Sequence, residues 1–161
     1  MTLKQLNIAT NIAYEAHRNQ FRRDGKTPYI EHVKSVVGRL RGQPNEVIAT
    51  AWLHDVLEDS DWMPSDLEKA GICREVVHAV VTLTHTKACK YESYLQLISE
   101  EPIARTVKIA DMLSNLADNP TDKQIRKYAK GLLMLVPESR TSCLRTLRSA
   151  TCATTCIRYG S

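Results

Sequence analysis

The sequence predicts an all-α protein, and three observations support that prediction. Apolar residues recur every three or four positions through most of residues 1–136, which is the period of an amphipathic helix. No segment alternates apolar and polar residues in the way that a half-buried strand does. Glycine, proline and residues that favour helix N-caps separate the periodic stretches. At most, we expect one short hairpin near residues 21–28.

The periodic stretches predict eight helices. Thr2 is a suitable N-cap for the first, which we expect to continue towards the turn signal Asp24-Gly25. Asn45 is a suitable N-cap for the third, which we expect to run as one helix from Glu46 to about Glu58. The predicted ranges are 3–22, 30–40, 46–58, 64–70, 73–84, 91–99, 102–116 and 122–135.

The chain has 161 residues, which is the usual length of a single domain. We place that domain at residues 1–136. After Pro137 the composition changes to Ser, Thr, Arg and Cys with few apolar residues. We therefore expect residues 137–161 to form a weakly structured C-terminal tail, with at most a short helix at 142–149.

Composition narrows the functional classes. The net charge of +4 is mild and the basic residues are spread along the chain, so no nucleic-acid partner is expected. No segment reaches the roughly 20 apolar residues of a membrane span, and the first residues lack the apolar run of a signal peptide. The five cysteines include no CxxC pair. We expect a cytoplasmic protein that does not contact a membrane; the sequence carries no signal of its oligomeric state.

A polar cluster interrupts the apolar third helix. His54, Asp55, Glu58 and Asp59 place one imidazole and three carboxylates beside residues that we expect to be buried. Such a cluster is costly in an apolar setting unless it is paired or binds a cation. On a continuous helix, His54 and Glu58 would share a face, as would Asp55 and Asp59. The alternatives are a surface pair for His54 and Asp55, and a simple helix end for Glu58 and Asp59.

One helix cannot supply a full set of metal ligands, so further ligands must come from elsewhere. His32 lies in the second predicted helix, and Asp111 lies in the apolar run 107–113. Asp111 could instead be a structural hydrogen-bond acceptor. The candidate set is His32, His54, Asp55 and Asp111. Mixed imidazole and carboxylate ligands suit Mn²⁺, Fe²⁺ or Zn²⁺ better than Mg²⁺. We expect the remaining histidines, His17, His78 and His85, to be surface or satisfied core histidines and assign them no ligand role.

Four motifs occur in order along the chain: Arg-Arg-Asp-Gly at 22–25, Pro-Tyr-Ile-x-His at 28–32, Leu-His-Asp-x-x-Glu-Asp at 53–59, and Val-Lys-Ile-Ala-Asp-x-x-x-Asn at 107–115. Over about residues 5–120 the chain thereby resembles the HD-domain phosphohydrolases, specifically the small alarmone (ppGpp) hydrolases of the RelA/SpoT-type family. The resemblance implies an HD-domain helical bundle with a central metal site.

The resemblance also implies roles for individual residues. Mn²⁺ would be bound by His32, His54, Asp55 and Asp111. Glu58 and Asp59 would be the catalytic pair that activates water and relays protons. Nucleotide contacts are implied for Arg22, Arg23, Lys108 and Asn115, with a structural salt bridge as the alternative for Lys108. The implied reaction is hydrolysis of a pyrophosphate or phosphate from the ribose 3′ position of a guanosine nucleotide, a small anionic substrate.

The chain departs from the family pattern at several places. Asn19 and Val33 replace the usual Gly and Pro, and Ala117-Asp118 replaces the usual Arg followed by Thr or Asp. The stretch 84–105 is shorter than in the large bifunctional enzymes of the family. Two alternatives therefore stay open. One is a phosphatase acting on another nucleotide, such as the 2′-phosphate of NADPH or a nucleoside monophosphate. The other is a non-catalytic nucleotide-binding sensor, which would have no need of Glu58 and Asp59.

Overall fold

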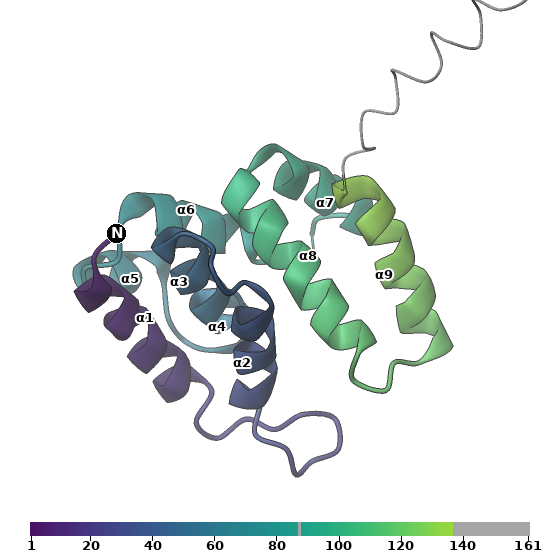
Figure 1. The fold of residues 1–161 in the computed structure, drawn as a ribbon, viewed down its shortest axis with the longest axis horizontal. Coiled ribbons are helices and arrows are strands. Elements are labelled where there is room, and N and C mark those ends of the chain that lie inside the picture. The colour runs from purple at the N-terminus through teal and green to yellow at the C-terminus, as the bar shows by residue number, and fades with distance from the viewer. Residues whose placement is uncertain (87, 137–161) are drawn as a thin grey trace, which may run out of the picture.

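A computed structural model describes residues 1–86 and 88–136, and over these residues it contains nine helices and no strand (Figure 1). The helices are α1 (Leu3–Ala16), α2 (Ile30–Arg39), α3 (Asn45–Leu53), α4 (Val56–Asp59), α5 (Pro64–Lys69), α6 (Arg74–Leu83), α7 (Tyr91–Glu100), α8 (Pro102–Leu116) and α9 (Asp122–Leu135). The prediction of an all-α protein is confirmed.

Helix α3 lies at the centre of the molecule. It packs against α1, α2, α6 and α8. Val47, Ala49, Ala51 and Leu53 are all buried, so the helix is apolar on nearly every side. The small alanine side chains let neighbouring helices approach closely, as in other tightly packed interiors. The residues that follow α3 therefore lie in the middle of the fold.

The helices form two groups, with α1–α6 on one side and α7–α9 on the other (Figure 1). Helix α8 joins the groups, because it packs on α2, α3 and α6 as well as on α7 and α9. At Gly131, α9 comes close to α8: a Cβ atom there would lie 2.7 Å from the Cε atom of the buried Met112. The junction between the two groups carries the candidate site.

The prediction of one continuous helix over 46–58 is wrong. The chain forms α3 and α4 instead, with His54 and Asp55 between them, and Pro44 rather than Asn45 precedes α3. The His54 Nδ1 atom bonds the carbonyl oxygen of Ala51, and the Asp55 carboxylate accepts a hydrogen bond from the Tyr29 hydroxyl. Adjacent residues of an uninterrupted helix diverge by about 100°. The break allows both side chains to face the same site.

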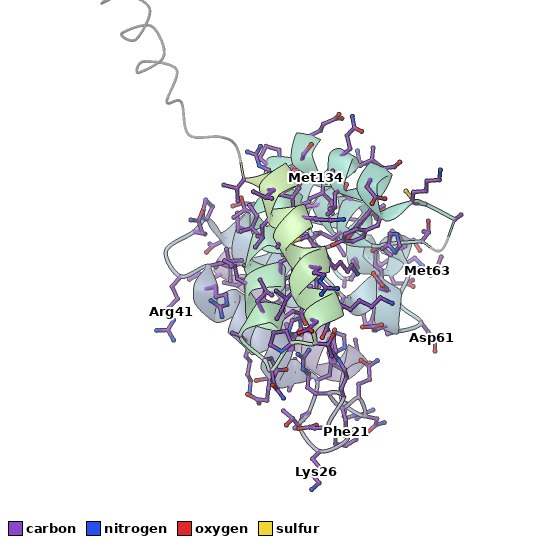
Figure 2. All side chains as sticks on the ribbon, turned by 90° about the vertical axis from the view of Figure 1, so that its right-hand side faces the viewer. Phe21, Lys26, Arg41, Asp61, Met63 and Met134 are labelled. Atoms are coloured by element: carbon purple, nitrogen blue, oxygen red, sulfur yellow. The ribbon has the colours of Figure 1, made fainter. Side chains whose placement is uncertain are left out.

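The first helix is also shorter than predicted, since α1 ends at Ala16 and not near residue 22. His17 is buried, and its Nδ1 atom lies 2.7 Å from Oε1 of Gln20. The backbone amide of Gln20 donates a hydrogen bond to the carbonyl oxygen of His17, and the chain turns there. A single antiparallel bridge then joins Phe21 to Pro28, which matches the hairpin expected there. Figure 2 shows Phe21 and Lys26 on the loop that projects from the helices.

The other helices lie within one or two residues of their predicted ranges, a difference that helix ends commonly show. Among the described residues no helix is both long enough and apolar enough to cross a bilayer. The predicted tail 137–161, with its short helix at 142–149, lies outside the described residues.

Candidate metal centre and active site

Three separate segments bring the four predicted metal ligands together. His32 comes from the first turn of α2, His54 and Asp55 from the break between α3 and α4, and Asp111 from α8. His32, His54 and Asp111 are almost fully buried, and Asp55 is half-buried. The apolar faces of α2, α3 and α8 pack against each other, and this packing places the polar residues at one point.

The ligand atoms lie at distances that suit a shared cation. One atom each from His32, His54 and Asp55 lie within 4.8 Å of one another. Asp111 adjoins this group through its Oδ1 atom, which is 3.2 Å from Nε2 of His32. Nε2 of His54 lies 3.0 Å from Oδ2 of Asp55. The structure thus brings together all four residues that the sequence suggested as ligands.

His54 supplies the test of whether a cation fits. Its Nδ1 atom is 2.8 Å from the Ala51 carbonyl oxygen, an acceptor, so Nδ1 carries the hydrogen. In the neutral ring, Nε2 then carries a lone pair and no hydrogen. Nε2 is buried and has no hydrogen-bond partner among the described residues, although a carboxylate oxygen lies 3.0 Å away. Two lone pairs that face each other in a buried site are stable only with a proton or a metal cation between them, so the donor set fits a divalent cation.

The electrostatics of the site agree with this fit. Burial alone lowers the pKa of His54, but the carboxylates of Asp55 and Asp111 overcome that effect and raise the pKa to about 9. Burial alone raises the pKa of Asp55 and of Asp111. His54 nevertheless holds the pKa of Asp55 far below its usual value, and the Lys108 ammonium does the same for Asp111. The carboxylates are therefore ionised and available to a cation.

Three residues hold the ligands from outside. The Tyr29 hydroxyl donates to Oδ2 of Asp55 at 2.6 Å, and the Asn115 amide donates to Oδ1 of Asp111 at 2.6 Å. Lys108 forms an ion pair with Asp111, with Nζ 3.0 Å from Oδ2. Such partners fix the orientation of ligands around metals in proteins. The ion pair of Lys108 matches the structural alternative considered for it.

Glu58 and Asp59 stand beside the ligands on α4, and both are exposed. Oε2 of Glu58 accepts a hydrogen bond of 3.1 Å from the backbone amide of His85. The Asp59 carbonyl oxygen accepts one of 2.5 Å from the Gln20 side chain. Although much of Asp59 is exposed, its pKa lies above its usual value, first because of partial burial and then because of the neighbouring charges of Asp55 and Glu58. A carboxylate with a raised pKa is suited to accept and return a proton.

A cavity of about 210 Å³ opens directly onto the ligands. Its walls are almost wholly polar. They include the ligands His32, Asp55 and Asp111, the neighbouring Glu58, Lys108 and Asn115, and residues from α7, α9 and the segment before α7. Lys108 and Asn115, two of the predicted nucleotide contacts, thus face the same space as the ligands.

The two predicted arginines lie on the other side of His32. Arg22 lines a second cavity of about 230 Å³, which His32 also lines. Its guanidinium lies 5.8 Å from the centre of the Tyr29 ring, and its Nε atom donates to Oδ2 of Asp118 at 3.1 Å. Arg23 donates instead to the Gln124 side chain on α9 at 2.7 Å and does not line either of these two cavities. Arg22 therefore lines a cavity that reaches the candidate ligand His32, whereas Arg23 meets Arg22 only in a third cavity of about 180 Å³, which none of the four candidate ligands lines.

Several residues of the site were not singled out from the sequence. Tyr29 could have been found, because it precedes His32 by three residues and so shares its side of the chain. His85, which we expected to be a surface or core histidine, lines the cavity. Tyr91, Tyr94, Lys127 and Tyr128 line it as well. They come from α7 and α9, and no pattern in the sequence connects those segments with the HD motif.

His17 differs in part from its expected role. It is fully buried and packs on the Tyr29 ring at 5.0 Å between ring centres. Its Nδ1 atom pairs with Gln20, but Nε2 has no hydrogen-bond partner among residues 1–86 and 88–136. It is therefore a core histidine of which only one nitrogen is satisfied.

Comparison with known proteins identifies relatives of this chain by sequence. The chain is 37% identical over 118 residues to a protein of Danio rerio named guanosine-3′,5′-bis(diphosphate) 3′-pyrophosphohydrolase MESH1, a match that covers 67% of this chain and 65% of that protein. It is 34% identical over 124 residues to the protein of the same name from Mus musculus, covering 71% and 69% of the two chains. The chain therefore spans about two thirds of the length of these relatives. No model of a protein family matches it.

A solved structure resembles this fold closely. It represents a metazoan orthologue of SpoT, described as hydrolysing ppGpp and as playing a role in starvation responses. The TM-score is 0.71 at 25% sequence identity, and the match covers 92% of this chain and 94% of the other. With the helical fold, the clustered His and Asp side chains and these relatives in agreement, the chain belongs to the family of HD-domain guanosine-3′,5′-bis(diphosphate) 3′-pyrophosphohydrolases.

Proposed function

We propose that this protein is a Mn²⁺-dependent phosphohydrolase that removes the 3′-pyrophosphate from guanosine 3′,5′-bis(diphosphate). The observation that carries the proposal is the convergence of His32, His54, Asp55 and Asp111 beside the carboxylates of α4. The proposed substrate is inferred from the activity that the names of the relatives give. Mixed imidazole and carboxylate ligands favour Mn²⁺ over Mg²⁺, with Fe²⁺ and Zn²⁺ as the other candidates.

The reaction needs a water molecule, an acceptor for its proton and a route for the leaving group. A divalent cation bound by the four ligands would lower the pKa of water and offset charge on the phosphoryl oxygens. Glu58 lines the cavity and takes the proton of the attacking water, while Asp59 relays it. The new bond joins the water oxygen to the phosphorus on the ribose 3′ oxygen. The bond from that phosphorus to the 3′ oxygen breaks, and the proton is passed to the ribose oxygen.

The residues around the ligands have supporting roles in this scheme. Tyr29 and Asn115 orient Asp55 and Asp111, and Lys108 balances the charge of Asp111. Arg22 presents a planar guanidinium in the second cavity, where it can stack on a base or bind phosphate. Each cavity alone is smaller than the roughly 300 Å³ of an ordinary small-molecule site. A nucleotide would therefore extend across His32 from one cavity into the other.

Two substitutions separate metal binding from proton transfer. Asp55→Ala removes a ligand, so it should lose both Mn²⁺ and activity. Glu58→Gln keeps the shape of the side chain but cannot accept a proton, so it should retain Mn²⁺ while turnover falls by at least about 100-fold. Pyrophosphate release from ppGpp and bound Mn²⁺ would be measured for both variants and for the wild-type protein, with and without a chelator.

A substrate panel decides among the remaining functions. No pyrophosphate release from ppGpp by the Mn²⁺-loaded protein would reject the proposal. Release of phosphate from NADPH or from nucleoside monophosphates would then identify a phosphatase. Binding of ppGpp without turnover of any substrate would identify a nucleotide sensor.

A further inference from the structure

One wall of the metal cavity carries a group of residues that the proposed mechanism does not use. Tyr91 begins α7, and Lys127 and Tyr128 lie on α9. All three line the same cavity as His32, Asp55 and Asp111. The candidate ligands come from α2, α8 and the break after α3, whereas these three residues come from α7 and α9. Figure 1 shows α7 and α9 in the second group of helices, together with α8. We refer to Tyr91, Lys127 and Tyr128 as the distal wall.

The cation of the distal wall has no acidic partner among the described residues. Two lysines line the cavity, and Lys108 is already paired with Asp111 at 3.0 Å. Lys127 makes no ion pair with residues 1–86 or 88–136; its Nζ atom lies over the Tyr91 ring at 4.4 Å and the Tyr128 ring at 5.7 Å. Lys127 is largely exposed, and its pKa lies below its usual value, first through partial burial against the cavity wall and then through repulsion from Lys108. A bound anion would relieve both effects.

The Tyr91 hydroxyl is a second group without a partner. It is buried, and within the part of the chain that the structure describes it has no hydrogen-bond partner. A buried hydroxyl that is left unpaired is costly, so native structures rarely retain one without a reason. Tyr91 also lies beside Lys127 and lines the cavity. The Lys127 ammonium lies over the Tyr91 ring, so the wall of one cavity carries both an ammonium and a hydroxyl donor, the groups that bind phosphate oxygens.

Resting on the proposed function, we infer that Lys127 and the Tyr91 hydroxyl bind the distal phosphoryl group of the substrate's 3′-diphosphate. The phosphorus under attack must lie at the metal ligands, and the next phosphoryl group continues from there into the cavity. The base and ribose lie on the opposite side, towards the cavity of Arg22 and His32. The distal phosphoryl group does not react, so contacts to it add binding energy away from the reacting bond.

This arrangement makes the distal wall the part of the site that distinguishes a diphosphate from a monophosphate at the ribose 3′ position. A 3′-monophosphate would place its phosphorus at the metal ligands but would leave Lys127 and Tyr91 unpaired. A site whose polar groups are left unpaired by an analogue discriminates strongly against it. The chain should therefore prefer guanosine nucleotides with a 3′-diphosphate.

The test compares two substrates, guanosine 5′-diphosphate 3′-diphosphate and guanosine 5′-diphosphate 3′-monophosphate. Lys127→Met keeps most of the side-chain stem and removes the charge, and Tyr91→Phe removes only the hydroxyl. For the 3′-diphosphate we expect kcat/KM to fall about tenfold in Lys127→Met and about threefold in Tyr91→Phe. For the 3′-monophosphate neither variant should change kcat/KM. Lys130→Met, an exposed lysine on the same helix, is the matched control and should behave as wild type with both substrates.

A binding measurement separates this inference from the proposed function. Calorimetry with the Mn²⁺-loaded protein would compare inorganic pyrophosphate with orthophosphate, and it needs no turnover. Pyrophosphate should bind more tightly than orthophosphate to the wild type, and Lys127→Met should abolish that difference. Equal losses on both nucleotides, or an unchanged preference for pyrophosphate in Lys127→Met, would overturn the assignment of the distal wall. A wild-type protein that binds pyrophosphate through Lys127 but does not hydrolyse ppGpp would refute the proposed function alone.

Discussion

At the scale of single residues, the candidate metal centre depends on side chains that are not themselves ligands. Tyr29 holds one carboxylate oxygen of Asp55 at 2.6 Å, and its ring packs between His17 and His32 at 5.0 and 5.5 Å. Burial is the main reason that the pKa of Tyr29 lies far above its usual value, with the Asp55 carboxylate adding to it. The hydroxyl therefore stays protonated and always acts as a donor to Asp55.

Tyr29→Phe tests this role. The substitution keeps the ring packing but frees Asp55 to rotate, so the affinity for Mn²⁺ should fall by about 10-fold to 100-fold. Metal titration followed by calorimetry would measure the change. Tyr14→Phe is the matched control, because Tyr14 is exposed on α1, packs on Trp52 and does not line the metal cavity. Unchanged affinity in Tyr29→Phe would show that Asp55 is oriented by the backbone alone.

At the scale of elements, the positions at which helices end, as well as the faces that they bury, place side chains in the site. The break between α3 and α4 turns His54 and Asp55 towards one point, and the early end of α1 at Ala16 lets His17 and Gln20 reach Tyr29 and Asp59. Helix α9 carries Lys127 and Tyr128 of the distal wall, and Gly131 lets this helix pack closely on Met112 of α8. Each of these features places a polar side chain beside the cavity.

Two glycine substitutions measure that close packing. Gly38 is exposed in α2, and a methyl group at its Cα would meet no atom within 4 Å, so Gly38→Ala should stabilise the protein by about 0.5–1 kcal/mol through helix propensity. At Gly131 the same methyl group would lie 2.7 Å from the buried Met112 side chain, so Gly131→Ala should destabilise it by about 0.5–2 kcal/mol. Chemical denaturation would compare the two. Equal stabilisation by both would contradict the packing of α9 on α8.

At the scale of the whole molecule, the candidate metal centre joins segments far apart in the sequence. Its ligands come from α2, from the break after α3 and from α8, and α8 connects the two groups of helices. A cation at this point would be bound by the folded chain and not by the unfolded one. Binding of that kind stabilises the folded state by mass action.

Metal removal should therefore lower the melting temperature. With free Mn²⁺ at 100 times its Kd, the folded state gains about 2.7 kcal/mol, which corresponds to about 5–10 °C for a chain of this size. Thermal unfolding followed by circular dichroism, with Mn²⁺ and with a chelator, would measure the difference. Asp55→Ala serves as the control and should show no response to Mn²⁺. The same increase in Asp55→Ala would indicate that Mn²⁺ acts at another place.

The sequence determined the helical fold and pointed to the candidate ligands. The three- to four-residue period set most helix positions, and the spacing of His32, His54, Asp55 and Asp111 within otherwise apolar helices marked residues that needed a partner. These signals are local, because each depends on residues that lie within one or two helical turns. They do not show which segments of the chain will be in contact in the folded protein.

Only the tertiary structure decided how the site is divided among those segments. No glycine or proline at His54 and Asp55 marks the helix break in the sequence. The break is accompanied instead by contacts of these two side chains with the Tyr29 hydroxyl and the Ala51 carbonyl oxygen. Likewise, Tyr91 and Lys127 face the ligands only because α7 and α9 pack beside α8. Sequence periodicity describes which side of a helix is buried, whereas the packing of helices far apart in the chain decides which polar groups share a cavity.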